Sequence, residues 1–147
     1  MLYKYTIYYL LTGILLSGYF LNYQFNTIYK MYTVYGIPNC NTVKKALDWL
    51  DKHKETYLFH NYKKEGITPV KLKSWSKQVG WEILLNKKGT TWRALDAATQ
   101  ATITNEKAAI DLMAASTSII KRPVIEKDNT IVTAVGFDEK EYEKLFL

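Results

Sequence analysis

The alternation of apolar and polar residues predicts a strand that leads into a helix, starting at Tyr32. Tyr32–Gly36 (YTVYG) is short, β-branched and aromatic, and a Gly-x-Pro turn follows it. Apolar residues then recur with the 3.6-residue period of an amphipathic helix, at Val43, Ala46, Leu47 and Leu50. We expect Asn39 or Asn41 to cap this helix.

The next apolar runs extend this pattern to a strand–helix–strand unit. Residues 56–62 (TYLFHNY) have the composition of a second strand. The pattern of residues 68–80 predicts a helix that begins at Thr68 and Pro69 and ends at Gly80. A strand, a helix and a second strand at this spacing are typical of a βαβ unit with a right-handed crossover.

The remaining pattern predicts an all-helical insertion followed by a hairpin and a closing helix. A polar, glycine-containing loop at residues 86–91 interrupts the helical periodicity. Two helical stretches follow, at residues 96–101 and 104–115, and Thr104 is the expected cap of the second. Two short strands flank an Asp128-Asn129 turn, and Asp138 caps the last helix. The order βαβ, helical insertion, ββα predicts an α/β fold for residues 31–147.

Composition changes abruptly near Lys30. The first thirty residues hold seven of the twelve tyrosines and no acidic residue. Residues 5–20 are sixteen uncharged residues, slightly fewer than the roughly 20 that a spanning helix needs. Residues 1–30 are therefore either an uncleaved membrane anchor or membrane-lying helix, or a translated upstream extension of a protein that starts at Met31. The strand-like run directly after Met31 favours the second interpretation.

Charge and cysteine content narrow the classes of function. The formal net charge of +6 divides into +2 for residues 1–30 and +4 for residues 31–147, where basic and acidic residues are interleaved. Direct nucleic-acid binding through charge calls for a concentrated basic stripe, so we expect none. A single cysteine excludes an intramolecular disulfide and suits a reducing compartment. We expect a cytoplasmic location, with membrane attachment only if residues 1–30 are retained.

The single cysteine, Cys40, lies where the predicted helix begins. Amide N–H groups at a helix N-terminus favour the thiolate, which is the nucleophilic form, and Lys44 lies one turn further on. A lone cysteine is often buried and inert, but this position favours a reactive thiol. His53 and His60 supply too few ligands, at an unsuitable spacing, for zinc, so we expect no metal site.

Three motifs carry a resemblance to a known family: GIPNC after the first strand, LLNKKGTTWR in the central loop and IIKRPVI before the hairpin. In their order and distances they resemble the arsenate reductase (ArsC) and Spx-like family. The branch that this chain resembles most is that of the YffB-like thiol reductases, for which glutathione is the expected reductant. The resemblance covers Tyr32 to Leu147 and implies a thioredoxin-like fold.

The resemblance assigns roles to three residues around the thiol. Cys40 corresponds to the redox nucleophile that follows the first strand. Arg122 corresponds to the arginine of an Arg-Pro pair that binds the anionic substrate or the thiolate, because a planar fork of donors suits oxyanions and carboxylates. Pro123 corresponds to a cis-proline whose backbone lies alongside the thiol.

The resemblance also implies that further cations line the site and hold an acidic thiol such as glutathione. These cations are Lys44 of the predicted helix and Lys87, Lys88 and Arg93 of the central loop. The alternative for the loop residues is that they are solvated surface charges, as most lysines are.

Departures from the family pattern limit the expected chemistry. Arsenate reductases carry a His-Asn pair before the proline and a further arginine in the last hairpin. This chain has Gly36-Ile37 and residues 134–137 (AVGF) at those places, so we do not expect efficient arsenate reduction. Spx-type regulators often switch through a Cys-x-x-Cys disulfide, which Val43 excludes here.

Two hypotheses from different classes follow. In the first, the chain is a monothiol oxidoreductase in which Cys40 attacks a disulfide or an oxyanion. Glutathione or another small thiol then resolves the intermediate as a co-substrate, with no bound cofactor. In the second, the chain is a Spx- or MgsR-like transcription regulator that docks on RNA polymerase without a disulfide switch.

Overall fold

The computed structural model describes residues 31–147, and the expectations for residues 1–30 lie outside the described residues. The strands are β1 (Tyr32–Gly36), β2 (Tyr57–Asn61), β3 (Val124–Lys127) and β4 (Ile131–Val135). The helices are α2 (Asn41–Lys52), α3 (Tyr62–Glu65), α4 (Pro69–Val79), α5 (Trp81–Leu84), α6 (Thr90–Arg93), α7 (Ala97–Thr102), α8 (Glu106–Ala115), the 3₁₀ turn η2 (Thr117–Ile119) and α9 (Glu139–Phe146). Between residues 31 and 147, no helix is both long and apolar enough to cross a membrane.

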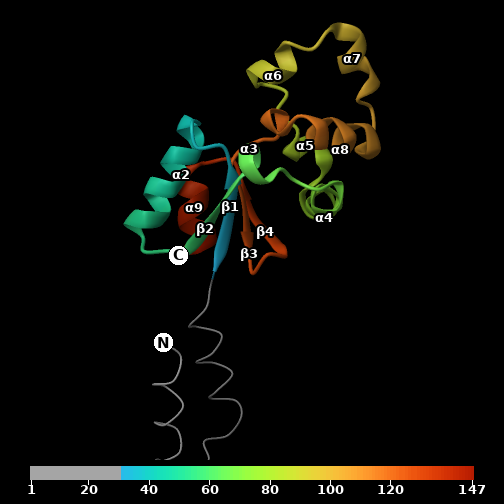
Figure 1. The fold of residues 1–147 in the computed structure, drawn as a ribbon. Helices are drawn as coiled ribbons and strands as arrows, with labels where there is room; N and C mark the ends of the chain where they lie inside the picture. The colour runs from blue at the N-terminus through green and yellow to red at the C-terminus, as the bar shows by residue number, and fades with distance from the viewer. Residues whose placement is uncertain (1–30) are drawn as a thin grey trace, which may run out of the picture. The chain divides into compact units, whose positions relative to one another are not determined.

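The four strands form one mixed sheet in the order β2-β1-β3-β4 (Figure 1). β1 and β2 are parallel, with Gly36 opposite Asn61, and α2 connects them as the expected βαβ unit. β3 is antiparallel to both β1 and β4, so the predicted hairpin is confirmed. All five residues of β1 are buried, because the strand has a neighbour on each side and helices on each face.

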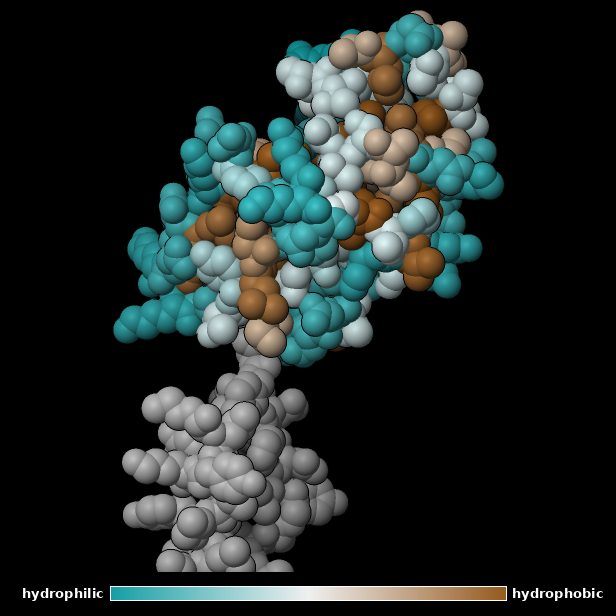
Figure 2. Space-filling view, viewed as in Figure 1, coloured by the Kyte–Doolittle hydropathy of each residue, from teal (hydrophilic) through white to brown (hydrophobic). Residues whose placement is uncertain are grey.

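Helices cover both faces of the sheet (Figure 1). One face packs against α2 and α9, in a core cluster that includes Val34 and Ile125 of the sheet. The other face, with Tyr35 and Val124, packs against α4 and the helical insertion. Successive residues of a strand point to opposite faces, so β1 supplies both clusters from alternate positions. The visible surface in Figure 2 is more hydrophilic over α2 and more apolar over the insertion.

Several local predictions are confirmed at the level of single residues. The Thr68 hydroxyl accepts a hydrogen bond from the Lys71 amide at 3.1 Å and caps α4. Asp138 caps α9 by accepting from the Glu141 amide at 3.1 Å. The hairpin turn places Asp128 and Asn129 at φ of 52° and 56°, a conformation that Asp and Asn tolerate well.

Two predicted caps are wrong. Cys40 itself, rather than Asn39 or Asn41, is the N-cap of α2. Asn105, one residue after the expected Thr104, caps α8, because its Oδ1 accepts the Ala108 amide at 3.0 Å. The short helices α3, α5 and α6 were also not expected, since four residues are too few to establish a hydrophobic period.

Glu126 of β3 carries a fully buried carboxylate that ties the sheet to α4. It accepts hydrogen bonds from Trp75 Nε1 at 2.6 Å, from the Tyr35 hydroxyl at 2.8 Å and from Lys71 Nζ at 3.0 Å. The Glu126 side chain is 0% exposed and that of Lys71 is 28% exposed. A buried carboxylate is compatible with a stable fold only when its oxygens are paired in this way.

Candidate active site around Cys40

Close packing at Gly36 positions the start of α2 and therefore the thiol. The carbonyl of Cys40 accepts the Lys44 amide at 2.9 Å, which is the first hydrogen bond of the helix. A Cβ atom at Gly36 would lie 2.9 Å from Val43 Cγ2, closer than real Cβ contacts allow. Only glycine lets α2 approach β1 this closely, so Cys40 lies just beyond the carboxyl end of β1.

The strand register brings two other segments to the same end of the sheet. Asn61 is the last residue of β2 and pairs with Gly36, so Tyr62 follows directly beside the loop that leads to Cys40. Tyr35 pairs with Val124, so Arg122 also lies at this end. The Arg122–Pro123 peptide bond is cis, as the family resemblance implied.

The surroundings of Cys40 lower the pKa of its thiol. Partial burial raises the pKa, but the amide groups of Val43 and Thr42 and the guanidinium of Arg122 together lower it by more. The side chain makes no capping hydrogen bond of ordinary geometry, so we attribute the shift to dipoles and charge around the sulfur. A lowered pKa enlarges the thiolate fraction at neutral pH and therefore the nucleophilic reactivity.

Arg122 is held by the segment that precedes it. Its Nη1 donates a hydrogen bond to the carbonyl of Ser118, in the 3₁₀ turn η2, at 2.9 Å. Its Nε is buried and has no hydrogen-bond partner within residues 31–147. The guanidinium therefore has one nitrogen bonded to the backbone and one buried N–H donor without an acceptor.

The other predicted cations are less closely tied to the thiol. Lys44, Lys88 and Arg93 are exposed, in the first turn of α2, in the turn before α6 and at the end of α6. Within residues 31–147, Arg122 is the cation that shifts the pKa of Cys40. A substrate-binding role for the three exposed residues stays a prediction.

Lys87 has partners within the insertion. Its Nζ lies 5.5 Å from the ring centroid of Trp81 and 5.6 Å from that of Trp92, within the range of a cation–π interaction. Trp92 is buried and belongs to the core cluster that packs against α4 and the insertion. Lys87 therefore stabilises the central loop through these two rings.

Sequence reasoning missed Tyr62, which the structure places beside the site with a buried hydroxyl that has no partner. A signal for it was present, because the residues that follow two adjacent parallel strands meet at one edge of a sheet. The expected strand over residues 56–62 includes Tyr62, whereas in the structure β2 ends at Asn61 and Tyr62 begins α3.

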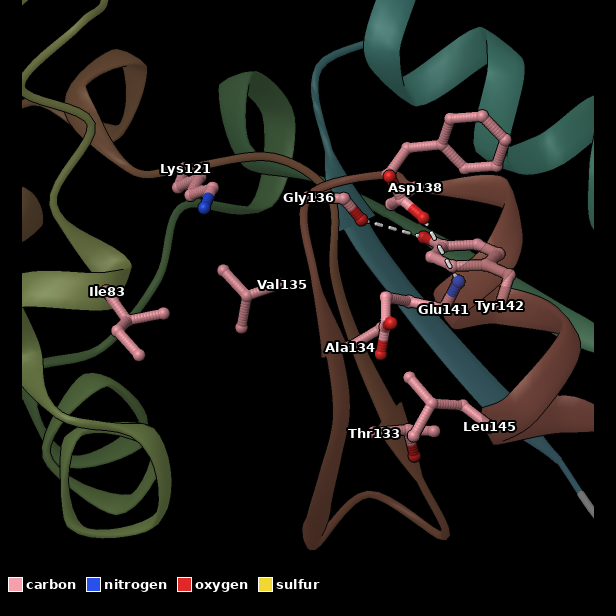
Figure 3. Close-up of a pocket in the computed structure, with 11 residues that line it drawn as sticks. Ile83, Lys121, Thr133, Ala134, Val135, Gly136, Asp138, Glu141, Tyr142 and Leu145 are labelled. Carbon is pink, nitrogen blue, oxygen red and sulfur yellow. Dashed lines mark hydrogen bonds between the residues drawn. The ribbon is translucent and has the colours of Figure 1, made fainter.

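Two other features of the described residues, the distribution of metal-ligating side chains and a surface groove beside α9, do not involve the thiol. In the part of the chain that the structure describes, His, Cys, Asp and Glu do not gather in groups of three or more that could hold a metal. A groove of about 360 Å³ is lined by β4 and α9 and, from other parts of the chain, by Ile83 and Lys121 (Figure 3). Cys40 is not among its lining residues, so the chemistry lies elsewhere.

Comparison with known proteins finds relatives that match most of residues 31–147. A family model described as the ArsC family matches residues 35–145. An uncharacterized protein of Haemophilus influenzae is 41% identical over 116 residues, which cover 79% of this chain and 99% of that protein. The global transcriptional regulator Spx of Streptococcus pyogenes is 26% identical over 113 residues, which cover 76% of this chain and 81% of the regulator. The solved structure of the YFFB protein has a TM-score of 0.71 and 43% identity, and covers 79% of this chain and 99% of its own.

Proposed function

The chain belongs to the ArsC family, and from this premise we propose that it is a monothiol reductase with Cys40 as nucleophile and glutathione as co-substrate. One observation carries the proposal: the thiol at the start of α2 has a lowered pKa despite its partial burial, because the Val43 and Thr42 amides and Arg122 favour the thiolate. Such a thiol is suited to attack at sulfur.

The reaction with a disulfide balances as two exchange steps. The Cys40 thiolate attacks one sulfur of the substrate, a new S–S bond joins Cys40 to that sulfur, and the other sulfur leaves as a thiolate. A glutathione thiolate then attacks the substrate sulfur of this mixed disulfide and releases the Cys40 thiolate. A second glutathione completes the reduction, so that both electrons come from glutathione, which becomes its disulfide.

The need for an external thiol follows from the sequence. Cys40 is the only cysteine of the chain, so no second cysteine can resolve the mixed disulfide within one molecule. Glutathione carries two carboxylates, and the planar donor fork of Arg122 is suited to bind one of them. An anionic thiol is therefore favoured over a neutral one.

A second candidate function has its own support in the Spx relative, which is a transcriptional regulator by name. In this alternative the chain docks on RNA polymerase and Cys40 has no catalytic role. Val43 occupies the position of the second cysteine in a Cys-x-x-Cys switch, so such a regulator would work without that disulfide. The two candidates differ in whether activity requires the thiol.

The rate of mixed-disulfide formation tests the leading proposal. We expect the full-length protein to react faster with oxidised glutathione than with hydroxyethyl disulfide, which is neutral. Arg122→Ala should slow the glutathione reaction about ten- to a hundredfold, because a hydrogen bond to a charged group contributes about 1.5–3 kcal/mol. Arg122→Lys should fall between the two, since lysine keeps the charge but lacks the fork.

The matched control is Cys40→Ser, which should form no adduct with either reagent. If Arg122→Ala slows both disulfides equally, Arg122 acts on the thiolate and not on the ligand. If the wild-type protein forms no adduct and a pull-down recovers RNA polymerase with Cys40→Ser as well as with the wild type, the reductase proposal is wrong and the regulator is supported.

A further inference from the structure

Three buried side-chain polar atoms in residues 31–147 have no hydrogen-bond partner: Trp49 Nε1, the Tyr62 hydroxyl oxygen and Arg122 Nε. Trp49 lies in the core between the sheet, α2 and α9. The other two lie at the end of the sheet where Cys40 is found. A buried donor without a partner costs about 1–3 kcal/mol, so two of them beside a reactive thiol call for an explanation.

The register of the sheet brings these two residues to the same end of β1. Tyr62 follows Asn61 of β2, which pairs with Gly36 of β1. Arg122 lies two residues before Val124 of β3, which pairs with Tyr35 of β1. Tyr62 and Arg122 therefore flank the end of β1 from opposite sides. The Tyr62 ring packs 6.4 Å from that of Tyr35, centroid to centroid, which holds it against the sheet.

Electrostatics agrees with this placement. Burial raises the pKa of Tyr62 well above its ordinary value, while the positive charge of Arg122 acts in the opposite direction and so lies near the hydroxyl. The hydroxyl therefore stays protonated at physiological pH and can donate a hydrogen bond. Arg122 Nε is also a donor, so an acceptor between the two would satisfy both.

We propose that the Tyr62 hydroxyl and Arg122 Nε form a donor pair for one anionic oxygen of the molecule that reacts with Cys40. This inference rests on the proposed function and narrows the substrate class to thiols and disulfides that carry a carboxylate near the sulfur. Arg122 as a whole is only partly buried, so a ligand reaches the donor pair from the solvent side of this residue. A free inorganic oxyanion has the same acceptor chemistry and is tested separately.

Tyr62→Phe in the full-length protein is the decisive variant, because it removes only the hydroxyl oxygen. The hydroxyl makes no hydrogen bond to any of residues 31–147, so the melting temperature should be unchanged or higher. The rate with oxidised glutathione should fall about tenfold or more, in line with a lost hydrogen bond to a charged acceptor. The rates with hydroxyethyl disulfide and with iodoacetamide should be unchanged.

Tyr142→Phe is the matched control at a buried tyrosine away from the thiol. Its hydroxyl donates to the Gly136 carbonyl at 2.9 Å, as Figure 3 shows, so its loss should lower the melting temperature. The preference for oxidised glutathione over the neutral disulfide should not change. The two phenylalanine variants therefore separate a ligand-binding hydroxyl from a structural one.

Protection of Cys40 from iodoacetamide by inorganic phosphate identifies the source of the acceptor. If Tyr62→Phe slows only the reaction with oxidised glutathione, the acceptor is a carboxylate of that ligand. If Tyr62→Phe loses only the protection of Cys40 by phosphate, the donor pair exists but its ligand is a free oxyanion. If Tyr62→Phe changes neither, the inference is wrong, even where the wild type still prefers glutathione. If the wild type reacts with neither disulfide and phosphate does not protect it, the proposed function and this inference both fail.

Discussion

Two buried polar clusters of this molecule satisfy their hydrogen bonds in different ways. Around Glu126, three donors converge on one carboxylate, and the buried charge is compensated within the protein. Near Cys40, the Tyr62 hydroxyl and Arg122 Nε are buried without partners. Tyr35 joins the two regions, because its hydroxyl donates to Glu126 and its ring packs near Tyr62.

The difference separates a structural cluster from a functional one. A fully paired cluster stabilises the fold and has no remaining capacity for a ligand. An incompletely paired cluster costs stability in the free protein, and a ligand that supplies the acceptor recovers that cost on binding. The contrast predicts large effects on stability at Glu126 and effects on reactivity, with little effect on stability, at Tyr62.

The largest effect is expected for Glu126→Ala. The change leaves Trp75 Nε1 and the Tyr35 hydroxyl buried without this acceptor and removes the ion-pair partner of Lys71. We expect the free energy of unfolding to fall by about 3–5 kcal/mol. Urea denaturation measures it, and Glu126→Gln, which keeps the shape and one acceptor oxygen, should lose less.

Glu141→Ala is the control for this experiment, since Glu141 is exposed and pairs only with Lys144 on the surface of α9. Its midpoint of unfolding should match that of the wild type. If Glu126→Ala has the same urea midpoint of unfolding as the wild type, the paired cluster does not stabilise the fold. The contrast between this cluster and the unpaired groups near Cys40 would then be wrong.

A smaller effect is expected for Gly36→Ala, which tests the packing that positions Cys40. The new methyl group would overlap Val43, so we expect a loss of about 1–3 kcal/mol in the free energy of unfolding and slower alkylation of Cys40. Val43→Ala added to this variant should restore part of the loss, although Val43→Ala alone should destabilise the protein. Additive losses in thermal unfolding would show that the two side chains do not clash.

The smallest effect concerns the titration of Cys40. Iodoacetamide alkylation against pH should have its midpoint below the free-cysteine value of about 8.5, because the helix amides and Arg122 outweigh partial burial. Reactivity should therefore persist to a lower pH than that of a free cysteine and be lost as the pH falls through the lowered midpoint. Arg122→Ala should raise the midpoint only part of the way, since the Val43 and Thr42 amides remain. A wild-type midpoint at or above 8.5 would contradict the electrostatic argument.

Much of this site could be predicted from local patterns. The strand Tyr32–Gly36, the helix that starts at Cys40 and the Asp128-Asn129 turn all follow from residues within a few positions of one another. Local hydrogen bonds, side-chain period and turn conformation depend only on such neighbours. The cap of α2 does not follow from composition, because asparagine, a favoured N-cap residue, stands on both sides of Cys40 while Cys40 itself takes the N-cap position.

The sequence by itself therefore determined the order of elements in residues 31–147 and the position of the one thiol at a helix start. The family resemblance implied Arg122 and Pro123 beside that thiol, but only the tertiary structure explains how they come there and adds Tyr62 to the site. Arg122 reaches Cys40 from 82 positions away in the chain, and Tyr62 comes from a different strand end, because the pairings of Tyr35 with Val124 and of Gly36 with Asn61 bring them there. Strand register depends on the burial of whole faces of the sheet, which no short stretch of sequence specifies.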